Sequence, residues 1–183
     1  CGLAEKGKTV ILSKLTSGKT KCSHRVELAT LIEERNPERE IIIGINPKLG
    51  ETIAELCLQK DCVLGLTNIQ SYRRETKMLN SRFDFTGVDE NGREFIMEVK
   101  SVPLADYVDV PKKERKNYKK EIEEANQDDK ISYFPDGYRK NSTAVVSPRA
   151  LKHITELKEI VTTTDKRAIL CFIIQRTDVK QFQ

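Results

Sequence analysis

The chain contains 183 residues, and its 32 Lys and Arg against 28 Asp and Glu give a formal net charge of +4. A hydrophobic share of 38% beside 33% charged residues is typical of a globular protein and excludes a wholly disordered one. The longest apolar stretch, residues 168–174, has the length of a strand and is too short to cross a membrane as a helix. We therefore expect no membrane-embedded segment and no membrane partner.

The cysteines are odd in number and include no CxxC pair, which argues against a disulfide scaffold and favours a reducing compartment. They are Cys1, Cys22, Cys57, Cys62 and Cys171. We therefore expect an intracellular, cytoplasmic protein, with association with a nucleoid or a nucleus as alternatives. Because the first residue is Cys and not Met, we expect the natural N-terminus to lie upstream and the first domain to be truncated.

Three short segments rich in β-branched residues, separated by turn residues, predict a small antiparallel β unit near the start of the chain. They are residues 9–13, 25–32 and 40–45. The sequence Asn-Pro-Lys-Leu-Gly at 46–50 interrupts this pattern, and helical spacing begins directly after it. We therefore predict two domains, residues 1–48 and residues 49–183.

Two helices with core-facing stripes are predicted in the second part. The first covers residues 51–59, and the second begins at Ser147 and Pro148, a favourable N-cap and first helical position. The expected stripes are Ile53, Leu56 and Cys57 in the first helix, and Leu151, Ile154, Leu157 and Val161 in the second.

The block 111–130 separates its charges, with basic residues first and acidic residues afterwards. We expect an exposed helix there, and its basic run has three interpretations: a patch that follows phosphates, a nuclear-localisation-like signal, or a solvated helix face. Residues 167–174 predict a strand covered on both faces. Helices and strands together predict an α/β or α+β layered domain around one mixed sheet.

The segments 82–88 and 93–100 are strand-like, and Asn91-Gly92 between them predicts a hairpin. Period-two alternation places Phe95, Met97 and Val99 on one face of the second strand and Ile96, Glu98 and Lys100 on the other. Phe83 and Phe85 are expected to join the first set. A three-residue loop, or a bulged tighter one, would set Asp84 directly opposite Glu98, whereas a slip of one residue would move Asp84 to the other face.

Two facing carboxylates repel each other unless a cation lies between them or one of them takes up a proton. A hard divalent ion such as Mg²⁺, bound by one or two carboxylates, water and a substrate phosphate, suits Asp84 and Glu98. Lys100 would then neutralise charge that develops on the phosphoryl group. The alternative is an ordinary solvated strand face, because Glu and Lys are common there and the spacing alone is weak.

Two motifs frame this pair: Asn-Ser-Arg-Phe-Asp-Phe at 80–85 and Glu-Val-Lys-Ser-Val at 98–102. Weaker motifs follow at 133–136, 149–157 and 171–176. In this order they resemble the sugar fermentation stimulation protein A (SfsA) family. The resemblance implies an N-terminal OB-like β domain followed by a PD-(D/E)XK nuclease-like domain, a mixed sheet flanked by helices, with DNA as the partner.

The resemblance also implies roles for individual residues. Its catalytic positions correspond to Asp84, Glu98 and Lys100, with Glu75 as a further acid, and Asp84 and Glu98 would hold Mg²⁺ or Mn²⁺. Residues expected to contact DNA are Arg73, Arg74, Lys77, Arg82 and Gln175. Asp136 and His153 are expected behind the site, with a turn-forming role for Asp136 and a structural hydrogen-bonding role for His153 as alternatives.

We therefore predict a DNA-binding protein with a metal-dependent, nuclease-like core that hydrolyses DNA phosphodiester bonds. Whether it is an enzyme, a Mg²⁺-dependent deoxyribonuclease, stays open at this point, because function depends on the site and not on the fold. One alternative is a non-catalytic DNA-binding or regulatory module on the same fold. Another is a protein-interaction module, which predicts no salt-sensitive retention of DNA.

Overall fold

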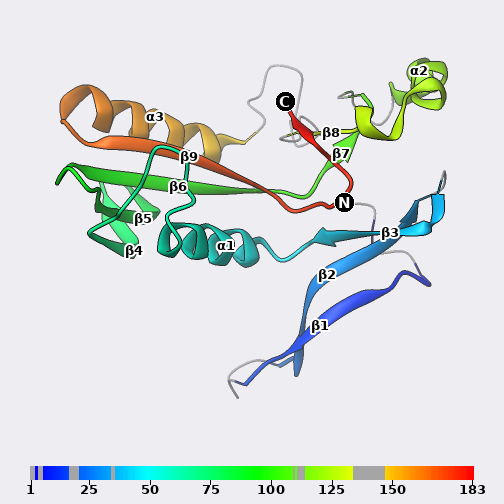
Figure 1. Ribbon diagram of the computed structural model, residues 1–183, viewed down its shortest axis with the longest axis horizontal. Helices are drawn as coiled ribbons and strands as arrows, with labels where there is room; N and C mark the ends of the chain where they lie inside the picture. Colours follow the sequence, from blue (N-terminus) through cyan, green and yellow to red (C-terminus); the bar gives the residue numbers. More distant parts are fainter. Residues whose placement is uncertain are drawn as a thin grey trace. The chain divides into compact units, whose positions relative to one another are not determined.

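Figure 1 shows the computed structural model of the chain. The described residues are 3, 6–16, 21–33, 36–108, 110, 114–133 and 147–183. The chain divides into two compact units, each assembled from separate stretches of sequence. The first unit contains Cys1–Leu49, Val102–Gly137 and Ile174–Gln183, and the second contains Gly50–Ser101 and Tyr138–Ile173.

The first unit contains two small sheets. One is the antiparallel sheet β1-β2-β3, formed by Val10–Lys14, His24–Glu33 and Asn36–Gly44. It confirms the β unit predicted from the β-branched segments. The other has the order β10-β8-β7 and consists of Gln181–Phe182, Ile131–Ser132 and Ala105–Asp106. An isolated bridge between Ile43 and Arg176 joins β3 to the chain that follows β9.

The prediction of one exposed helix over residues 111–130 is wrong within the described residues of this block. A 3₁₀ turn at Arg115–Tyr118 leads into the short helix α2, Lys119–Glu124, and a second 3₁₀ turn covers Gln127–Asp129. Lys119 and Lys120 lie 3.6 Å and 3.8 Å from the carboxylates four residues later, and all four side chains are exposed. The solvated-face interpretation therefore describes α2, whose short length follows from its thin apolar stripe.

The second unit is built on a sheet with the order β4-β5-β6-β9. Its strands are Ser71–Met78, Ser81–Val88, Glu94–Val102 and Arg167–Ile174, and its helices are α1, Pro47–Gln59, and α3, Pro148–Thr163. Ala54 and Leu58 of α1 pack on one face of the sheet, and Leu157 of α3 packs on the other. This mixed α/β arrangement confirms the predicted fold class, and no described helix is both long and apolar enough to traverse a lipid bilayer.

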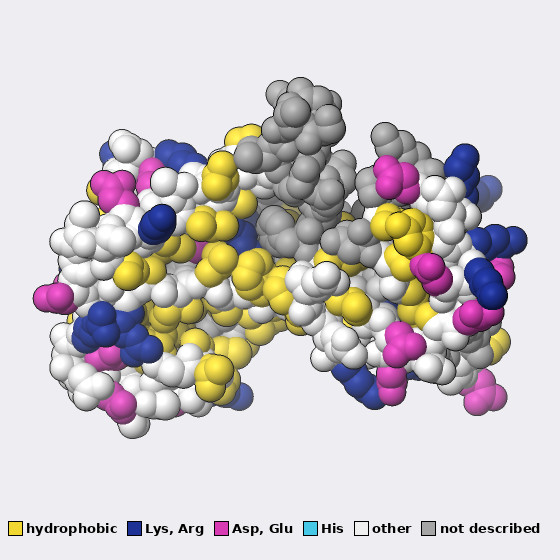
Figure 2. All heavy atoms as spheres, turned by 90° about the horizontal axis from the view of Figure 1, so that it is seen from above, with side chains coloured by type: hydrophobic (Ala, Val, Ile, Leu, Met, Phe, Trp, Pro, Cys, Tyr) yellow, Lys and Arg dark blue, Asp and Glu magenta, His cyan; other side chains and the backbone are white. Residues whose placement is uncertain are grey.

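Both helices are rotated from the predicted orientation, although Leu157 of α3 is buried as predicted. The buried residues of α1 are Gly50, Ala54 and Leu58, whereas Ile53 and Leu56 are exposed. The buried residues of α3 are His153, Glu156, Leu157 and Ile160, whereas Leu151, Ile154 and Val161 are about half exposed. Figure 2 shows hydrophobic side chains on the solvent-facing surface in the view from above. Apolar spacing predicted the wrong face because α1 buries the small residues Gly50 and Ala54, and α3 buries the polar residues His153 and Glu156.

The hairpin between β5 and β6 has the three-residue loop, which is one of the alternatives that the sequence left open. Val88 pairs with Glu94, and the Asp89 amide donates to the Arg93 carbonyl at 2.9 Å, which leaves a three-residue loop. Gly92 closes that loop with φ of 76°, a conformation that other residues adopt at a cost. The ladder of paired residues ends at Phe85 opposite Met97, so Asp84 and Glu98 follow directly after its last pair.

The ladder changes at Asp84, and this corrects one predicted face. Phe85 packs with Met97 on the α1 side, but Phe83 packs with Ile96 and Leu157 on the α3 side. The Val99 amide donates to the Asp84 carboxylate at 2.7 Å, so a side chain takes a bond that a regular ladder would give to backbone. Simple alternation therefore fails between Phe83 and Phe85.

Candidate active site

Asp84 and Glu98 lie on the adjacent strands β5 and β6. Glu98 is only 3% exposed, and Asp84 is partly buried and fixed by the Val99 amide. An acid on a central strand is held by the backbone hydrogen bonds on both sides of that strand. The sheet therefore presents two carboxyl groups from rigid elements, as a catalytic or metal site requires.

Glu98 has one satisfied and one unsatisfied oxygen. Its Oε1 accepts hydrogen bonds from Lys100 Nζ and from His153 Nδ1, each at 2.5 Å. Its Oε2 is fully buried, and no described donor reaches it. A buried carboxylate oxygen without a partner is costly, so this atom marks a position where a cation or a donor from a ligand would be stabilised.

The surroundings of Asp84 disfavour its ionised form. The pKa of Asp84 is raised from 3.8 to about 6: burial is the largest cause, the charges of Glu98 and Glu51 add to it, and the Val99 amide and Lys100 oppose it. A bound divalent cation would reverse this balance by favouring the ionised carboxylate.

Glu51, in the first turns of α1, is the acid that sequence analysis missed. Its charge acts on Asp84, and its carboxylate accepts from the Arg74 guanidinium at 3.0 Å. Arg74 also binds Glu55 at 2.7 Å and lies over the Phe85 ring at 5.5 Å from its centroid. The spacing of Glu51 and Glu55, four residues apart on a helix, was the available signal for one acidic face.

Glu75 is not brought into this group. The register of β4 and β5 places it opposite Asp84, but its φ is 51°, a left-handed conformation in the middle of a strand. Its carboxylate pairs instead with Arg82 at 3.1 Å, and both side chains are mostly exposed. The strained backbone at Glu75 lies beside the irregular step at Asp84, where both strands leave the regular ladder.

A family model described as "Sugar fermentation stimulation protein RE domain" matches residues 48–183 of the chain. The chain belongs to the SfsA family. A sugar fermentation stimulation protein homolog from Idiomarina loihiensis is 31% identical over 182 residues, which cover 98% of this chain and 62% of that protein. A homolog from Magnetococcus marinus is 27% identical, with 100% and 62% coverage. The chain therefore spans less than two thirds of the length of these relatives.

The solved structure of Pyrococcus furiosus SfsA in complex with Ca²⁺ is similar to this chain, with a TM-score of 0.63. The match covers 94% of this chain and 57% of that one, at 20% sequence identity. It supports the fold of this SfsA-family chain, which contains an OB-like unit and a core of sheet and helices.

The predicted DNA contacts of this SfsA chain differ in their surroundings. Arg73 and Lys77 are exposed on β4, whereas Arg74 and Arg82 are engaged in the ion pairs with α1 and with Glu75. Gln175 lies in the first unit, is only 8% exposed, and packs so tightly on Gly44 that a Cβ there would lie 1.9 Å from Gln175 Oε1. Asp136 lies outside the described residues.

His153 contacts the site directly through its hydrogen bond to Glu98. The Ser147 hydroxyl accepts from the Ala150 amide at 3.2 Å, which caps α3, and this cap and Pro148 confirm the predicted helix start. The His153 ring also packs 5.9 Å from the Phe83 ring, centroid to centroid. Because the Glu98 carboxylate accepts, His153 Nδ1 carries the proton in this hydrogen bond.

The donor set suits a hard cation with few protein ligands. Among the described residues no group of three His, Cys, Asp or Glu side chains is arranged to hold a metal ion. Two carboxylates, water and a substrate phosphate are sufficient for Mg²⁺, and the unpartnered Oε2 of Glu98 is available as one ligand. Asp84 and Glu98 are therefore the residues that could hold a Mg²⁺ or Mn²⁺ ion here.

Proposed function

We propose that this SfsA-family chain binds DNA and hydrolyses its phosphodiester bonds with a divalent cation held by Asp84 and Glu98. One observation carries the proposal: the buried Glu98 Oε2 has no partner among the described residues, next to an Asp84 whose pKa is raised to about 6. Two desolvated acids cost folding free energy, and a cation that joins them would offset that cost. The Ca²⁺ complex of Pyrococcus furiosus SfsA supports a site for a hard cation in this family.

A bound Mg²⁺ would polarise a phosphoryl oxygen and lower the pKa of a coordinated water. The chain's own residues then have distinct roles. Asp84 and Glu98 would hold the cation, and Lys100, whose side chain is 15% exposed, would offset negative charge that grows on the phosphate. His153 holds the Glu98 carboxylate in one orientation by its hydrogen bond to Oε1.

Glu51 would act at the edge of the site. Its position near Asp84 depends on Arg74, which binds Glu51 and Glu55 together. We expect Glu51 to bind a water in the outer shell of the cation, since two carboxylates already occupy the strands. Arg74 is then a positioning residue and not a DNA contact.

Exposed basic residues near the site support DNA as the substrate. Arg73 and Lys77 are exposed on β4, and their ammonium and guanidinium groups suit backbone phosphates. Affinity should therefore come mainly from phosphate contacts and fall steeply with salt. Replacement of either basic residue should weaken binding to DNA of every sequence alike.

The test is cleavage of labelled single- and double-stranded DNA in Mg²⁺, Mn²⁺, Ca²⁺ or EDTA, with retention of DNA measured in the same samples. Asp84→Asn, Glu98→Gln and Lys100→Met should each abolish metal-dependent cleavage while retention persists. Glu75→Gln is the matched control, because this acid lies opposite Asp84 in register but pairs with Arg82 outside the site. Cleavage that survives Glu98→Gln, or that Glu75→Gln also abolishes, would refute the assignment.

A second function, a non-catalytic DNA-binding module, is favoured by a different observation. Lys100 and His153 already bind Glu98 Oε1, so part of the negative charge of Glu98 is offset without a metal ion. Salt-sensitive retention of DNA with no cleavage in any metal would favour this module over the nuclease.

A further inference from the structure

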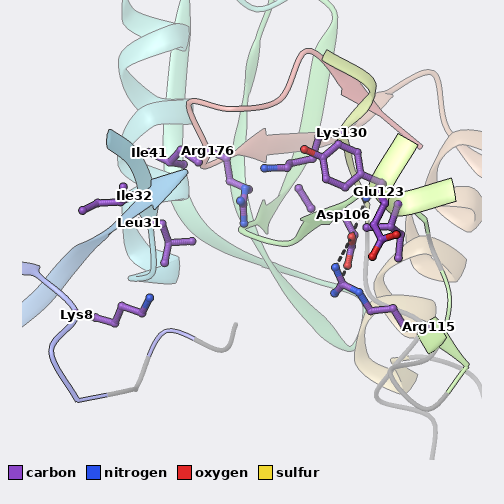
Figure 3. A pocket seen from close by; sticks show the side chains of 12 residues that line it. Lys8, Leu31, Ile32, Ile41, Asp106, Arg115, Glu123, Lys130 and Arg176 are labelled. Atoms are coloured by element: carbon purple, nitrogen blue, oxygen red, sulfur yellow. Dashed lines mark hydrogen bonds and ion pairs between the residues drawn. The ribbon is translucent and has the colours of Figure 1, made fainter. Parts of the chain in front are cut away.

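The first unit contains a cavity of about 580 Å³ that none of the site residues above enters. Figure 3 shows side chains from three parts of the chain around it, and all of them belong to the first unit. Its lining residues are Lys8, Leu31, Ile32, Ile41, Ala105, Asp106, Tyr107, Arg115, Ile122, Glu123, Lys130 and Arg176. A volume of several hundred Å³ is typical of sites for small organic ligands.

One wall of this cavity carries two nearly buried cations. The side chains of Lys130 and Arg176 are 13% and 10% exposed, and both bind the carboxylate of Asp178, at 2.7 Å and 2.8 Å. Asp178 itself is 1% exposed, and its pKa is lowered to about 2 because these cations outweigh the effect of burial. The two cations therefore share one ionised acid.

The charges around the cavity do not cancel. Lys8 and Arg115 add two more cations to the lining of the cavity. Figure 3 shows the Lys8 side chain extending toward the middle of the cavity. Asp106 is engaged by Arg115, with a hydrogen bond of 2.8 Å, and Glu123 lies 3.6 Å from Lys119 on α2. Four cations thus lie around the cavity with Asp106, Glu123 and Asp178, so the charged groups of the whole cavity sum to +1.

The opposite wall is apolar. Leu31, Ile32 and Ile41 come from β2 and β3, and Ile32 is 70% exposed. The ring of Tyr107 lies under Lys130 Nζ at 5.4 Å from its centroid. A ligand that matches both walls needs an anionic group and a flat or apolar group within one molecule.

We propose that this cavity binds a nucleoside phosphate, either a free mononucleotide or the phosphorylated end of a nucleic-acid strand. The phosphate would lie between Lys130 and Arg176 on one side and Lys8 on the other, as charge-assisted hydrogen bonds to an anion favour. The base would lie on the apolar wall formed by Leu31 and Ile41. This site does not depend on Asp84 and Glu98, so it stands or falls apart from the proposed nuclease.

The test is isothermal titration calorimetry of the chain in EDTA with deoxyadenosine 5′-monophosphate, deoxyadenosine and inorganic phosphate. We expect the monophosphate to bind at least tenfold more tightly than either part alone. Lys8→Ala should weaken it about fivefold and Lys130→Met at least tenfold. Lys120→Ala is the matched control, because Lys120 is an 85% exposed lysine of the same unit that does not line the cavity.

Two further arms identify the source of the phosphate. A 5′-phosphorylated octanucleotide that competes as well as the mononucleotide, while its 5′-hydroxyl counterpart does not, indicates a strand end. Competition by the mononucleotide alone indicates a free small molecule. Lys130→Met removes one partner of the buried Asp178, so circular dichroism of this variant is recorded to check that it folds. If Lys130→Met unfolds, Lys8→Ala decides the result. Undetectable binding of the monophosphate at millimolar concentration, or equal binding by wild type and Lys8→Ala, overturns the proposal.

Discussion

Asp84→Asn should stabilise the cation-free protein at pH 8 and leave its stability unchanged at pH 4. A carboxyl whose native pKa is raised binds its proton more tightly in the folded than in the unfolded state. Ionisation of Asp84 therefore lowers the free energy of unfolding as the pH rises from about 4, the unfolded value, through about 6, the native value. Asparagine is neutral throughout and can still accept from the Val99 amide.

The magnitude follows from the pKa change at Asp84. A rise from 3.8 to about 6 is about two powers of ten in proton affinity, each worth about 1.4 kcal/mol. Because the side chain is only partly buried, solvent screening reduces this ceiling, and we expect a gain of about 1–2 kcal/mol. The wild type is less stable by this amount because it keeps two acids close together, and such a loss of stability is common at functional sites.

The assay is urea unfolding followed by far-ultraviolet circular dichroism at pH 4, 6 and 8, in EDTA, for wild type and Asp84→Asn. Other titrating groups are common to both proteins and cancel in the difference. A variant that is less stable than wild type at pH 8, or a difference that is independent of pH, would refute the electrostatic account. Added Mg²⁺ should then raise the stability of the wild type alone, which tests the cation site separately.

Four other changes test the remaining structural claims. Gly87→Ala should destabilise the second unit by about 2–3 kcal/mol in urea unfolding, because a Cβ there would lie 2.3 Å from the Ser71 carbonyl and 2.6 Å from the Phe95 ring; an unchanged midpoint would contradict this packing. Asp178→Asn should cost about 3 kcal/mol at pH 7 by leaving Lys130 and Arg176 without their shared carboxylate. Because the pKa of Asp178 is lowered to about 2, the wild type should lose this stabilisation only as the pH falls from about 4 to about 2. His153→Ala should reduce metal-dependent cleavage about 10–100-fold with DNA retention unchanged, as expected for a residue that orients a metal ligand. Arg74→Met should reduce cleavage while changing the free energy of unfolding by less than about 1 kcal/mol, since Arg74 is 41% exposed; a large loss of stability would instead make Arg74 a structural residue.

Local rules predicted the hairpin of the candidate site correctly. The Asn91-Gly92 signal and the period of two predicted the two strands and a tight loop between them. The start of α3 followed equally from Ser147 and Pro148. In each case the determining interaction lies within a few residues of sequence, where propensity and turn chemistry are reliable.

The predicted alternation of side chains between the two faces of β5 failed where a carboxylate replaced a backbone carbonyl as the hydrogen-bond acceptor. The Asp84 carboxylate accepts the Val99 amide, so Phe83 turns to the α3 side while Phe85 stays on the α1 side. Apolar periodicity failed for α3 because His153 and Glu156 face the sheet, where His153 binds Glu98. Such polar burial depends on a partner more than fifty residues away, and a local pattern contains no trace of it.

The third acid shows why the site itself could not be read from spacing. By register, Glu75 is the strand neighbour of Asp84, yet a left-handed backbone directs its carboxylate to Arg82. Glu51 of α1 acts on Asp84 through its charge, and Arg74, the neighbour of Glu75 on β4, pairs with Glu51. The surroundings of these two acids are therefore decided by one left-handed residue and one ion pair, both of which arise from tertiary packing.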